Sequence, residues 1–258
     1  MGMQPLSAQE EKADQTPLDA KELTAARENF TIPNPGELLQ AASNNIDLKA
    51  IVEKIKAEPT ATSGSDAILA HTLGQLLADG FISLHAKDAA RTKAIGKELL
   101  AVGEKLGADE AILAEGKKIG QLVDAGSWSE ASTAADSFRT KLLVNLAKDG
   151  DVDLITIISA SGWLHGFSLI GGQIESAYQA DAAKHLRQSE LAAYLSGRVA
   201  KLPDGRVKDA AKAAKALTDI SELTKVAQDA SISKESIATI AKAAADGFAA
   251  LEGMPAKQ

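Results

Sequence analysis

The chain has 258 residues, a formal net charge of −7 at pH 7 and no cysteine. The acidic balance argues against a general affinity for nucleic acid or anionic lipid, and the lack of cysteine excludes disulfides, thiolate nucleophiles and iron–sulfur clusters. Hydrophobic residues make up 45% of the chain but aromatic residues only 3%, a composition dominated by Ala, Leu and Ile that favours closely packed helices over sheets. We therefore expect an all-α fold, a multi-helix bundle of about eight to ten helices.

The N-terminal part of the chain is polar before it becomes helical in pattern. Residues 1–16 are rich in Gln, Glu, Ser and Pro and are predicted to form a disordered leader, which lacks the basic start and apolar core of an intact signal peptide. We expect residues 17–258 to form a single helical domain. Its first helix is predicted over residues 17–30, and the next begins at Pro35 with Asn34 as its N-cap.

Turn and cap signals divide the rest of the chain into helices. A helix over residues 48–56 is followed by a loop at 57–65, and Ser65 or Asp66 begins a long helix that reaches about His85. Ser127 and Glu130 have the spacing of a capping box. Further helices are predicted at 88–106, 109–125, 128–148, 151–175, 180–201, 207–229 and 234–252. We expect them to form two antiparallel groups, at about 66–148 and 151–252.

A Gly-Phe pair after a polar residue occurs in three of these helices. The three copies are Asp79-Gly-Phe, His165-Gly-Phe and Asp246-Gly-Phe, and they use three of the five phenylalanines in the chain. Glycine inside a helix costs roughly 1 kcal/mol relative to alanine. We therefore expect each of these glycines to permit the close approach of a neighbouring helix.

The helix over residues 151–175 is the most apolar stretch of the chain. Its inner part, residues 154–173, has no charged side chain and is long enough to cross a bilayer. The run also contains three serines, a histidine and four glycines, and amphipathic helices surround it. We interpret it as a buried central helix and predict no membrane span.

Five residues of the Gly-Phe helices form the candidate ligand-binding site: Trp163, His165, Gly166, Asp79 and Asp246. If the three helices converge, the histidine and the two carboxylates would meet near one end of a shared groove, where they could bind a metal or act in acid–base chemistry. In a simpler interpretation, which we favour, each polar residue lies on the side of its helix opposite the core.

Other patterns give no catalytic or metal site. His71 and His85 are separated by about four helical turns, roughly 21 Å, and cannot share a metal. The acidic run from Asp149 to Asp153 begins like a calcium loop but lacks the required glycine and glutamate, so a helix cap explains it better. The sequence has no Walker loop, dinucleotide fingerprint or protease motif. We predict no catalytic residue, no metal and no cofactor.

Three lysines, Lys208, Lys212 and Lys215, share one face of the helix predicted at 207–229. A lysine stripe of this kind could dock on an acidic partner, but a solvated helix face is the more common explanation and the one that we adopt.

Three segments together resemble a family of helical bacterial envelope proteins of uncharacterised function. The segments are Ile32-Pro-Asn-Pro-Gly-Glu-Leu-Leu, Leu73-Gly-Gln-Leu-Leu-Ala-Asp-Gly-Phe and Ser161-Gly-Trp-Leu-His-Gly-Phe. That family looks like lipoproteins or secreted proteins with an Ile-Pro-x-Pro start, an Ala-Asp helix and a Gly-Trp-x-x-Gly helix. This chain departs from it in having His165 at an acidic position and no lipobox cysteine. The resemblance implies an all-α fold and export, and it implies no activity.

These observations support three hypotheses about function. The first is a non-enzymatic envelope protein, periplasmic or secreted, that binds a protein partner or a small ligand beside the Trp163 helix. The second is a structural module that assembles with itself through Ala-rich faces. The third is a metal-dependent enzyme that uses His165 with Asp79 or Asp246. The sequence leaves open a cytoplasmic location and the oligomeric state.

Overall fold

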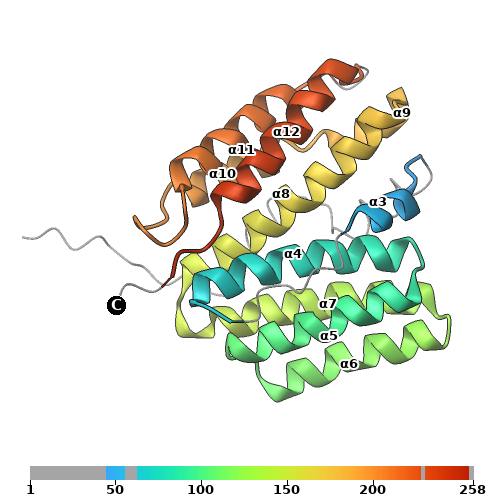
Figure 1. Ribbon diagram of the computed structural model, residues 1–258, viewed down its shortest axis with the longest axis vertical. Helices are drawn as coiled ribbons and strands as arrows, with labels where there is room; N and C mark the ends of the chain where they lie inside the picture. Colours follow the sequence, from blue (N-terminus) through green and yellow to red (C-terminus); the bar gives the residue numbers. More distant parts are fainter. Residues whose placement is uncertain (1–44, 56–62, 228–229, 256–258) are drawn as a thin grey trace, which may run out of the picture.

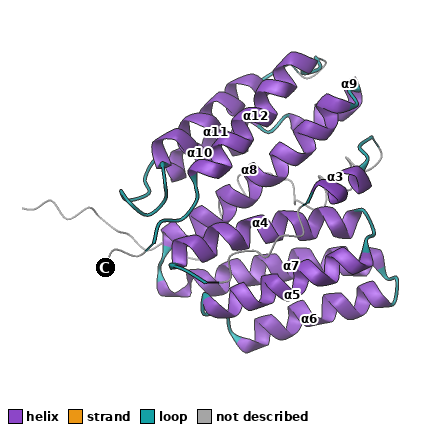
Figure 2. Cartoon of the chain, viewed as in Figure 1, coloured by secondary structure: helices purple, strands orange, loops and turns teal. Residues whose placement is uncertain are grey.

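The computed structural model describes residues 45–55, 63–227 and 230–255 (Figure 1). Every regular element within these ranges is a helix (Figure 2), apart from one isolated antiparallel bridge between Val207 and Gly253. The predicted all-α fold is therefore confirmed. The predicted leader, the helix at 17–30 and the helix start at Asn34 lie outside the described residues.

The helices of the first half form an antiparallel four-helix group, preceded by one short helix. Successive helices pack against each other, the fourth also contacts the first, and loops of only a few residues connect them, which requires neighbouring helices to run antiparallel. The group consists of α4 (Asp66–His85), α5 (Ala89–Lys105), α6 (Glu110–Asp124) and α7 (Trp128–Leu146), with α3 (Leu48–Lys54) before it and a 3₁₀ turn (Ala147–Asp149) after it.

The second half forms another group of four main helices around α8. In this group α8 contacts α12 and α10, and α11 packs against both α10 and α12. The elements are α8 (Val152–Ser176), α9 (Ala180–Ala183), a 3₁₀ turn (Lys184–Leu186), α10 (Ser189–Val199), α11 (Ala210–Thr224) and α12 (Lys234–Ala250). The two predicted antiparallel groups are thus present, and each begins with a Gly-Phe helix.

Short polar side chains determine where several helices begin. Ser65 accepts a hydrogen bond from the backbone N–H of Ile68 at α4, and Asp151 accepts one from Leu154 at α8. The cap interpretation of the acidic run before α8 is therefore confirmed for Asp151. Ser127 occupies the N-cap position of α7 but its side chain makes no capping hydrogen bond, so the predicted capping box with Glu130 is wrong.

The helix predicted at 180–201 is interrupted in the structure. Arg187 and Gln188 leave helical geometry, with ψ angles of 78° and 35°. This break lets the chain turn while Leu186, only 1% exposed, remains in the core. The prediction failed because the Ala-rich pattern on both sides is helical, and the position of the break depends on tertiary packing.

The helix predicted at 207–229 is also shorter, because its first residues pair with the C-terminal segment. The N–H of Lys208 donates to the carbonyl of Glu252 at 2.8 Å, and that of Met254 donates to Arg206 at 3.1 Å. α11 then begins after Asp209, whose side chain accepts from the N–H of Lys212. The segment that contains Glu252 and Met254 is therefore tied to the loop before α11.

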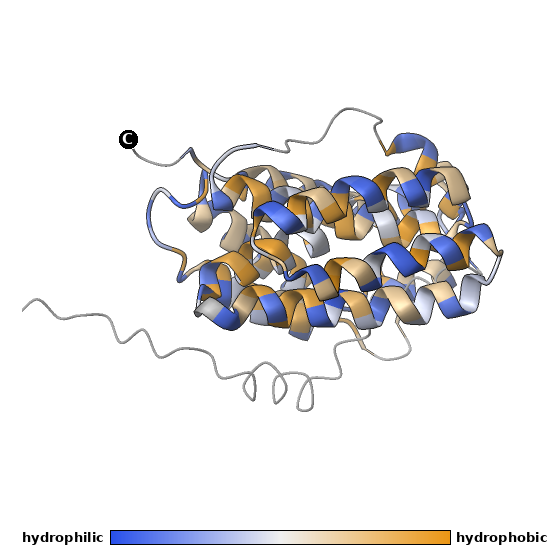
Figure 3. Ribbon diagram, turned by 90° about the horizontal axis from the view of Figure 1, so that it is seen from below, coloured by the Kyte–Doolittle hydropathy of each residue, from blue (hydrophilic) through white to orange (hydrophobic). Residues whose placement is uncertain are grey.

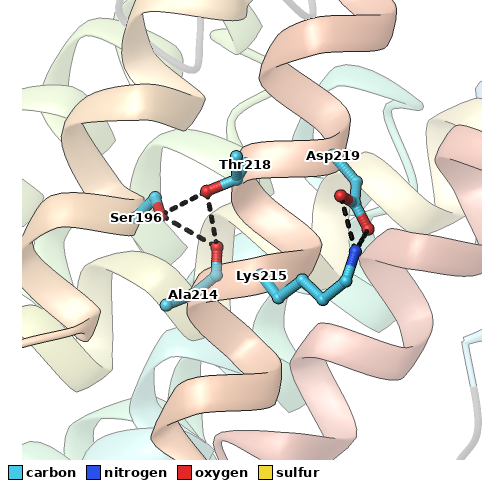
Figure 4. Close-up of polar contacts among 5 residues, drawn as sticks. All are labelled: Ser196, Ala214, Lys215, Thr218 and Asp219. Carbon is cyan, nitrogen blue, oxygen red and sulfur yellow. Dashed lines mark hydrogen bonds and ion pairs between the residues drawn. The ribbon is translucent and has the colours of Figure 1, made fainter.

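Of the three lysines predicted to share one helix face, Lys212 and Lys215 lie on α11, whereas Lys208 precedes the helix, so the stripe is shorter than predicted. All three side chains are exposed, and the interpretation as a solvated surface is confirmed. Lys215 pairs with Asp219 one turn later in the same helix, at 2.6 Å (Figure 4), and Lys208 lies 3.6 Å from Glu252. On another face of α11, the Ser196 hydroxyl of α10 bonds to the Ala214 carbonyl and to the Thr218 hydroxyl, each at 2.8 Å. The exposed lysines have acidic neighbours of their own, and α11 packs on α10 through the other face.

The helix α8 joins the two groups. It lies between α4 and α12 (Figure 1), and these two helices make the most extensive contacts with it. A single cluster of buried apolar side chains extends from Ile46 to Leu251 and includes residues of both groups. The outer helices carry alternating hydrophilic and hydrophobic segments (Figure 3), as expected for helices with one buried face.

Two of the described helices, α4 and α8, are long and apolar enough to cross a membrane. Most of the residues in their apolar stretches are buried within the protein. Packing between the two groups is sufficient to explain the composition of both helices.

The backbones of α4 and α8 come into close contact at Gly74 and Gly162. A Cβ atom built on Gly74 would lie 2.4 Å from the carbonyl oxygen of Ile158, and one on Gly162 would lie 2.8 Å from the carbonyl oxygen of Gly74. These distances are shorter than any van der Waals contact, so only glycine fits at either position.

The glycines of the Gly-Phe pairs do not all behave as predicted. A Cβ on Gly247 would lie 2.9 Å from Ala216, so this glycine does permit close packing. At Gly80 and Gly166, however, the nearest atom would be 3.5 Å away, an ordinary contact. The prediction of close approach is wrong at these two positions. Gly80 faces Ile95 of α5, and Gly166 lies about one turn after the closest α4–α8 contact at Gly162.

Alanine substitutions on α4 test this crossing with a matched pair. We expect Gly74→Ala to lower the free energy of unfolding by about 3 kcal/mol, because the added methyl group forces two backbones apart. Gly80→Ala should instead raise it by up to about 1 kcal/mol, because the site has room and alanine favours the helix. Urea denaturation followed by circular dichroism measures both. If the two substitutions had equal effects on the free energy of unfolding, the close backbone contact at Gly74 would be contradicted.

Candidate functional site

One face of α8 carries small and polar residues between α4 and α12. Ser161, His165, Ser168 and Gly172 recur every three or four residues and therefore lie along one side of the helix. Ser161 is completely buried, and the other three are partly buried. We call this side of α8 the histidine face.

The predicted residues His165 and Asp79 meet at this face. The Nε2 atom of His165 lies 2.8 Å from Oδ1 of Asp79 on α4, with side-chain exposures of 15% and 5%. The structure thus brings together two polar residues of different Gly-Phe pairs. The favoured interpretation from the sequence, that each polar residue lies opposite the core, is wrong for Asp79, because the crossing of α4 and α8 encloses this carboxylate.

Asp246, the third polar residue, does not join them. Its carboxylate pairs with Lys242 one turn earlier in α12 at 2.6 Å and is 47% exposed. The hydrogen bond from Lys242 lowers the pKa of Asp246 below its usual range. The alternative hypothesis, in which His165 meets both aspartates, is therefore wrong for Asp246, which faces solvent as the favoured interpretation predicted.

His71 is a member of the site that no sequence pattern indicated. Its Nδ1 atom lies 2.9 Å from the hydroxyl oxygen of Ser161, so this histidine of α4 also reaches the histidine face. His71 and Asp79 are eight residues apart, a little over two helical turns, and this spacing places them on the same side of α4. This spacing is the one feature of the sequence that could have linked His71 to Asp79. It indicates a shared site only once α4 is known to pack on α8.

The environment of His71 favours the neutral imidazole. Burial, reinforced by the charge of the neighbouring His165, lowers the pKa of His71 from 6.5 to about 4. Because a histidine in the unfolded chain takes up a proton near pH 6.5, this residue stabilises the fold fully above that pH. Its contribution is lost as the pH falls from about 6.5 to about 4.

Phe248 of α12 completes the arrangement. Its ring stacks on the imidazole of His71 with a centroid distance of 4.3 Å, and the His165 ring is tilted against it at 4.8 Å. The three rings, which we call the histidine row, come from α4, α8 and α12. The Gly-Phe helices therefore share one cluster of side chains, although Phe248 contributes to it in place of Asp246.

Trp163 and Gly166 have different surroundings. Trp163 is two residues from His165, or about 200° around the helix, and its ring stacks on Phe167 at 4.3 Å with an interplanar angle of 18°. A Cβ on Gly166 would meet Ala78 of α4 at 3.5 Å, so this glycine lies in the α4–α8 contact. Neither residue belongs to the histidine row.

The geometry limits the chemistry that the cluster can perform. A Ser–His–Asp triad requires one histidine between the hydroxyl and the carboxylate, but here His71 contacts Ser161 while Asp79 contacts His165. Ser161 is also 0% exposed, so a substrate cannot reach its hydroxyl. Within residues 45–55, 63–227 and 230–255, no three His, Asp or Glu side chains gather as a metal site would require.

Asparagine substitutions distinguish the enclosed carboxylate from the exposed one. We expect Asp79→Asn to lower the free energy of unfolding by about 1–3 kcal/mol, because the buried hydrogen bond to His165 loses its charge. Asp246→Asn should change it by less than about 0.5 kcal/mol, since a solvent-exposed ion pair contributes little. Thermal and urea denaturation would check this difference, and equal effects would show that Asp79 is not enclosed.

Comparison with known proteins adds no relative to this description. No protein-family model, curated protein or solved structure gives a significant match to the chain. Function is therefore inferred from the fold and from the histidine row.

Proposed function

We propose that this protein is a non-enzymatic helical binding protein that takes a partner or a small ligand beside α8, on its histidine face. The observation that carries the proposal is the histidine row, in which two imidazoles and a phenyl ring from three helices are gathered but only partly buried. Aromatic rings beside a few fixed polar groups are the usual composition of a ligand site.

Each imidazole in the row is held by one nitrogen. His71 uses Nδ1 toward Ser161 and His165 uses Nε2 toward Asp79. The second nitrogen of each ring has no hydrogen-bond partner among the described residues, and neither is among their fully buried unpaired atoms. Two oriented imidazole nitrogens thus remain able to bond to a ligand.

The histidine face also leaves space beside the row. A Cβ atom built on Gly172, two turns after His165, would meet no atom within 4 Å. Ser168 lies between these two residues and is only partly buried. A ligand that lies along α8 can therefore contact small side chains on the helix and the rings of the row at one end.

Binding agrees better with this geometry than catalysis does. The one hydroxyl in the cluster is enclosed, and the carboxylate and that hydroxyl are held by different histidines. His165 with Asp79 offers two metal ligands, whereas a catalytic zinc site uses three from the protein. We therefore do not favour the metal-dependent enzyme hypothesis.

Self-assembly through Ala-rich faces receives little support. In α11 the alanines Ala213, Ala214 and Ala216 are buried inside the protein itself. The large hydrophobic residues that are exposed among those described are Val144, Tyr178 and Met254, which lie on separate segments. The available apolar faces are thus already used within one chain.

An envelope location is part of the proposal and rests on the resemblance in the sequence alone. The segments Leu73–Phe81 and Ser161–Phe167, which carry most of that resemblance, form the crossing of α4 and α8 and contribute Asp79 and His165 to the site. The resemblance therefore falls on the part of the protein that organises the proposed binding face.

Imidazole resonances provide a direct test, because the chain has four histidines. We expect a ligand from a library of small aromatic and carboxylate compounds, or from a periplasmic extract, to shift the NMR signals of His71 and His165. The signals of His85 and His185 should not move, since both lie outside the row. A library and extract that leave all four unchanged, or shift all four alike, would contradict the proposal.

Two substitutions on different helices test where a ligand found in this way binds. Phe248→Leu removes the ring at the centre of the row and should weaken binding roughly tenfold. Trp163→Phe changes the other side of α8 and should leave the affinity unchanged. The opposite ranking of the two variants would place the ligand on the Trp163 side.

A further inference from the structure

Contacts of the histidine row connect α12 to α4 and α8. His71 lies between Ser161 of α8 and the ring of Phe248, and His165 lies on Asp79 and against the same phenyl ring. Phe248 is thus the point at which α12 meets both histidines. The contact includes His71, a titratable side chain that is enclosed between Ser161 and Phe248.

Few charged groups are available to compensate an additional positive charge at the row. From α4 the row receives Asp79, which is already hydrogen-bonded to His165 of α8. The charged groups of α12 nearest to Phe248 are Asp246 and Lys242, which are exposed and paired with each other. The charged group that acts on His71 is His165, which opposes protonation of His71. A proton on His71 would therefore place a positive charge beside Phe248 and His165 without a carboxylate to pair with it in the row.

We propose that acidification loosens α12 from α4 and α8 by charging His71, so that the histidine row acts as a pH-sensitive latch on the proposed binding face. The latch goes beyond binding itself, since it concerns the packing of α12 with or without a ligand.

Two features confine the effect to α12. The α4–α8 crossing depends on backbone contact at Gly74 and Gly162, which carry no titrating group. The C-terminal segment is tied separately to the loop before α11 and to Ser65, whose hydroxyl donates to the carbonyl of Met254 at 2.5 Å. The expected change is therefore a local opening around Phe248, with the first helical group intact.

One effect opposes the opening. An imidazolium stacked on a phenyl ring gains a cation–π attraction, although Phe is a weaker partner than Trp. Burial and the neighbouring His165 nevertheless lower the pKa of His71 to about 4. Loss of solvation in this enclosed position outweighs the attraction, because a single face of the phenyl ring cannot replace the water that a charged imidazole requires.

Hydrogen–deuterium exchange of the intact protein tests the latch. Between about pH 7 and about pH 4.5, and after correction for intrinsic rates, the opening constant of amides near Phe248 should rise roughly 50-fold, as expected for a group with its pKa lowered to about 4 in the closed state. Amides of α5 and α6 should keep their protection. The proposal would be overturned if amides of all helices lost protection to the same extent, or if the protection of α12 did not change.

Variants identify the histidine responsible. His71→Gln keeps a hydrogen-bonding side chain without a titrating group and should abolish most of the acid response of α12. The matched control is His85→Gln on the same helix, because burial lowers the pKa of His85 as well but its Nε2 faces Ser132 of α7 at 3.3 Å. An acid response that persists in His71→Gln, or disappears in His85→Gln, would refute the assignment.

A titration of the unmodified protein covers the case in which His71→Gln fails to fold. The imidazole carbon signals of His71 and the ring signals of Phe248 should change at the same pH. If His71 becomes protonated without any change at Phe248, the latch does not exist.

Discussion

The arrangement of this protein depends on the contact between the backbones of α4 and α8. Gly74 and Gly162 let the two helices approach so closely that a Cβ atom at either position would overlap the opposite backbone. Each of these helices begins one four-helix group, so this single crossing joins the two halves of the molecule. Apolar burial supplies most of the stabilisation in such a bundle, but the glycines determine which turns of the two helices face each other.

The histidine row follows from that crossing. With Gly74 against Gly162, nearby side chains on the two helices meet in pairs, His71 with Ser161 and Asp79 with His165. Each pair satisfies polar groups that would otherwise be costly to bury. Phe248 then closes the gap from α12. Polar residues at the centre of an apolar interface thus select one alignment of three helices, and one nitrogen of each imidazole has no hydrogen-bond partner among the described residues.

Composition and cap signals were sufficient to predict most of the helices. The site, in contrast, depends on contacts between residues that are far apart in the sequence. Ala-rich segments and residues such as Ser65 and Asp151 predicted the elements and most of their starts. The break near Arg187 and the pairing of residues 206–209 with the C-terminal segment depend on tertiary contacts and were missed. In the site, Asp79 and His165 were found through the Gly-Phe pattern, but Asp246 already had Lys242 one turn away as a local partner. His71 has no motif, and only the alignment of α4 on α8 brings it to Ser161.

The proposed binding face and the latch both require that side chains of α4, α8 and α12 form one row of rings. A nuclear Overhauser spectrum of the protein at neutral pH tests this row directly, because such contacts are seen only between protons a few ångströms apart. We expect cross-peaks from the ring protons of Phe248 to the imidazole protons of both His71 and His165. Cross-peaks to neither histidine, with Phe248 in contact only with α11, would contradict the row.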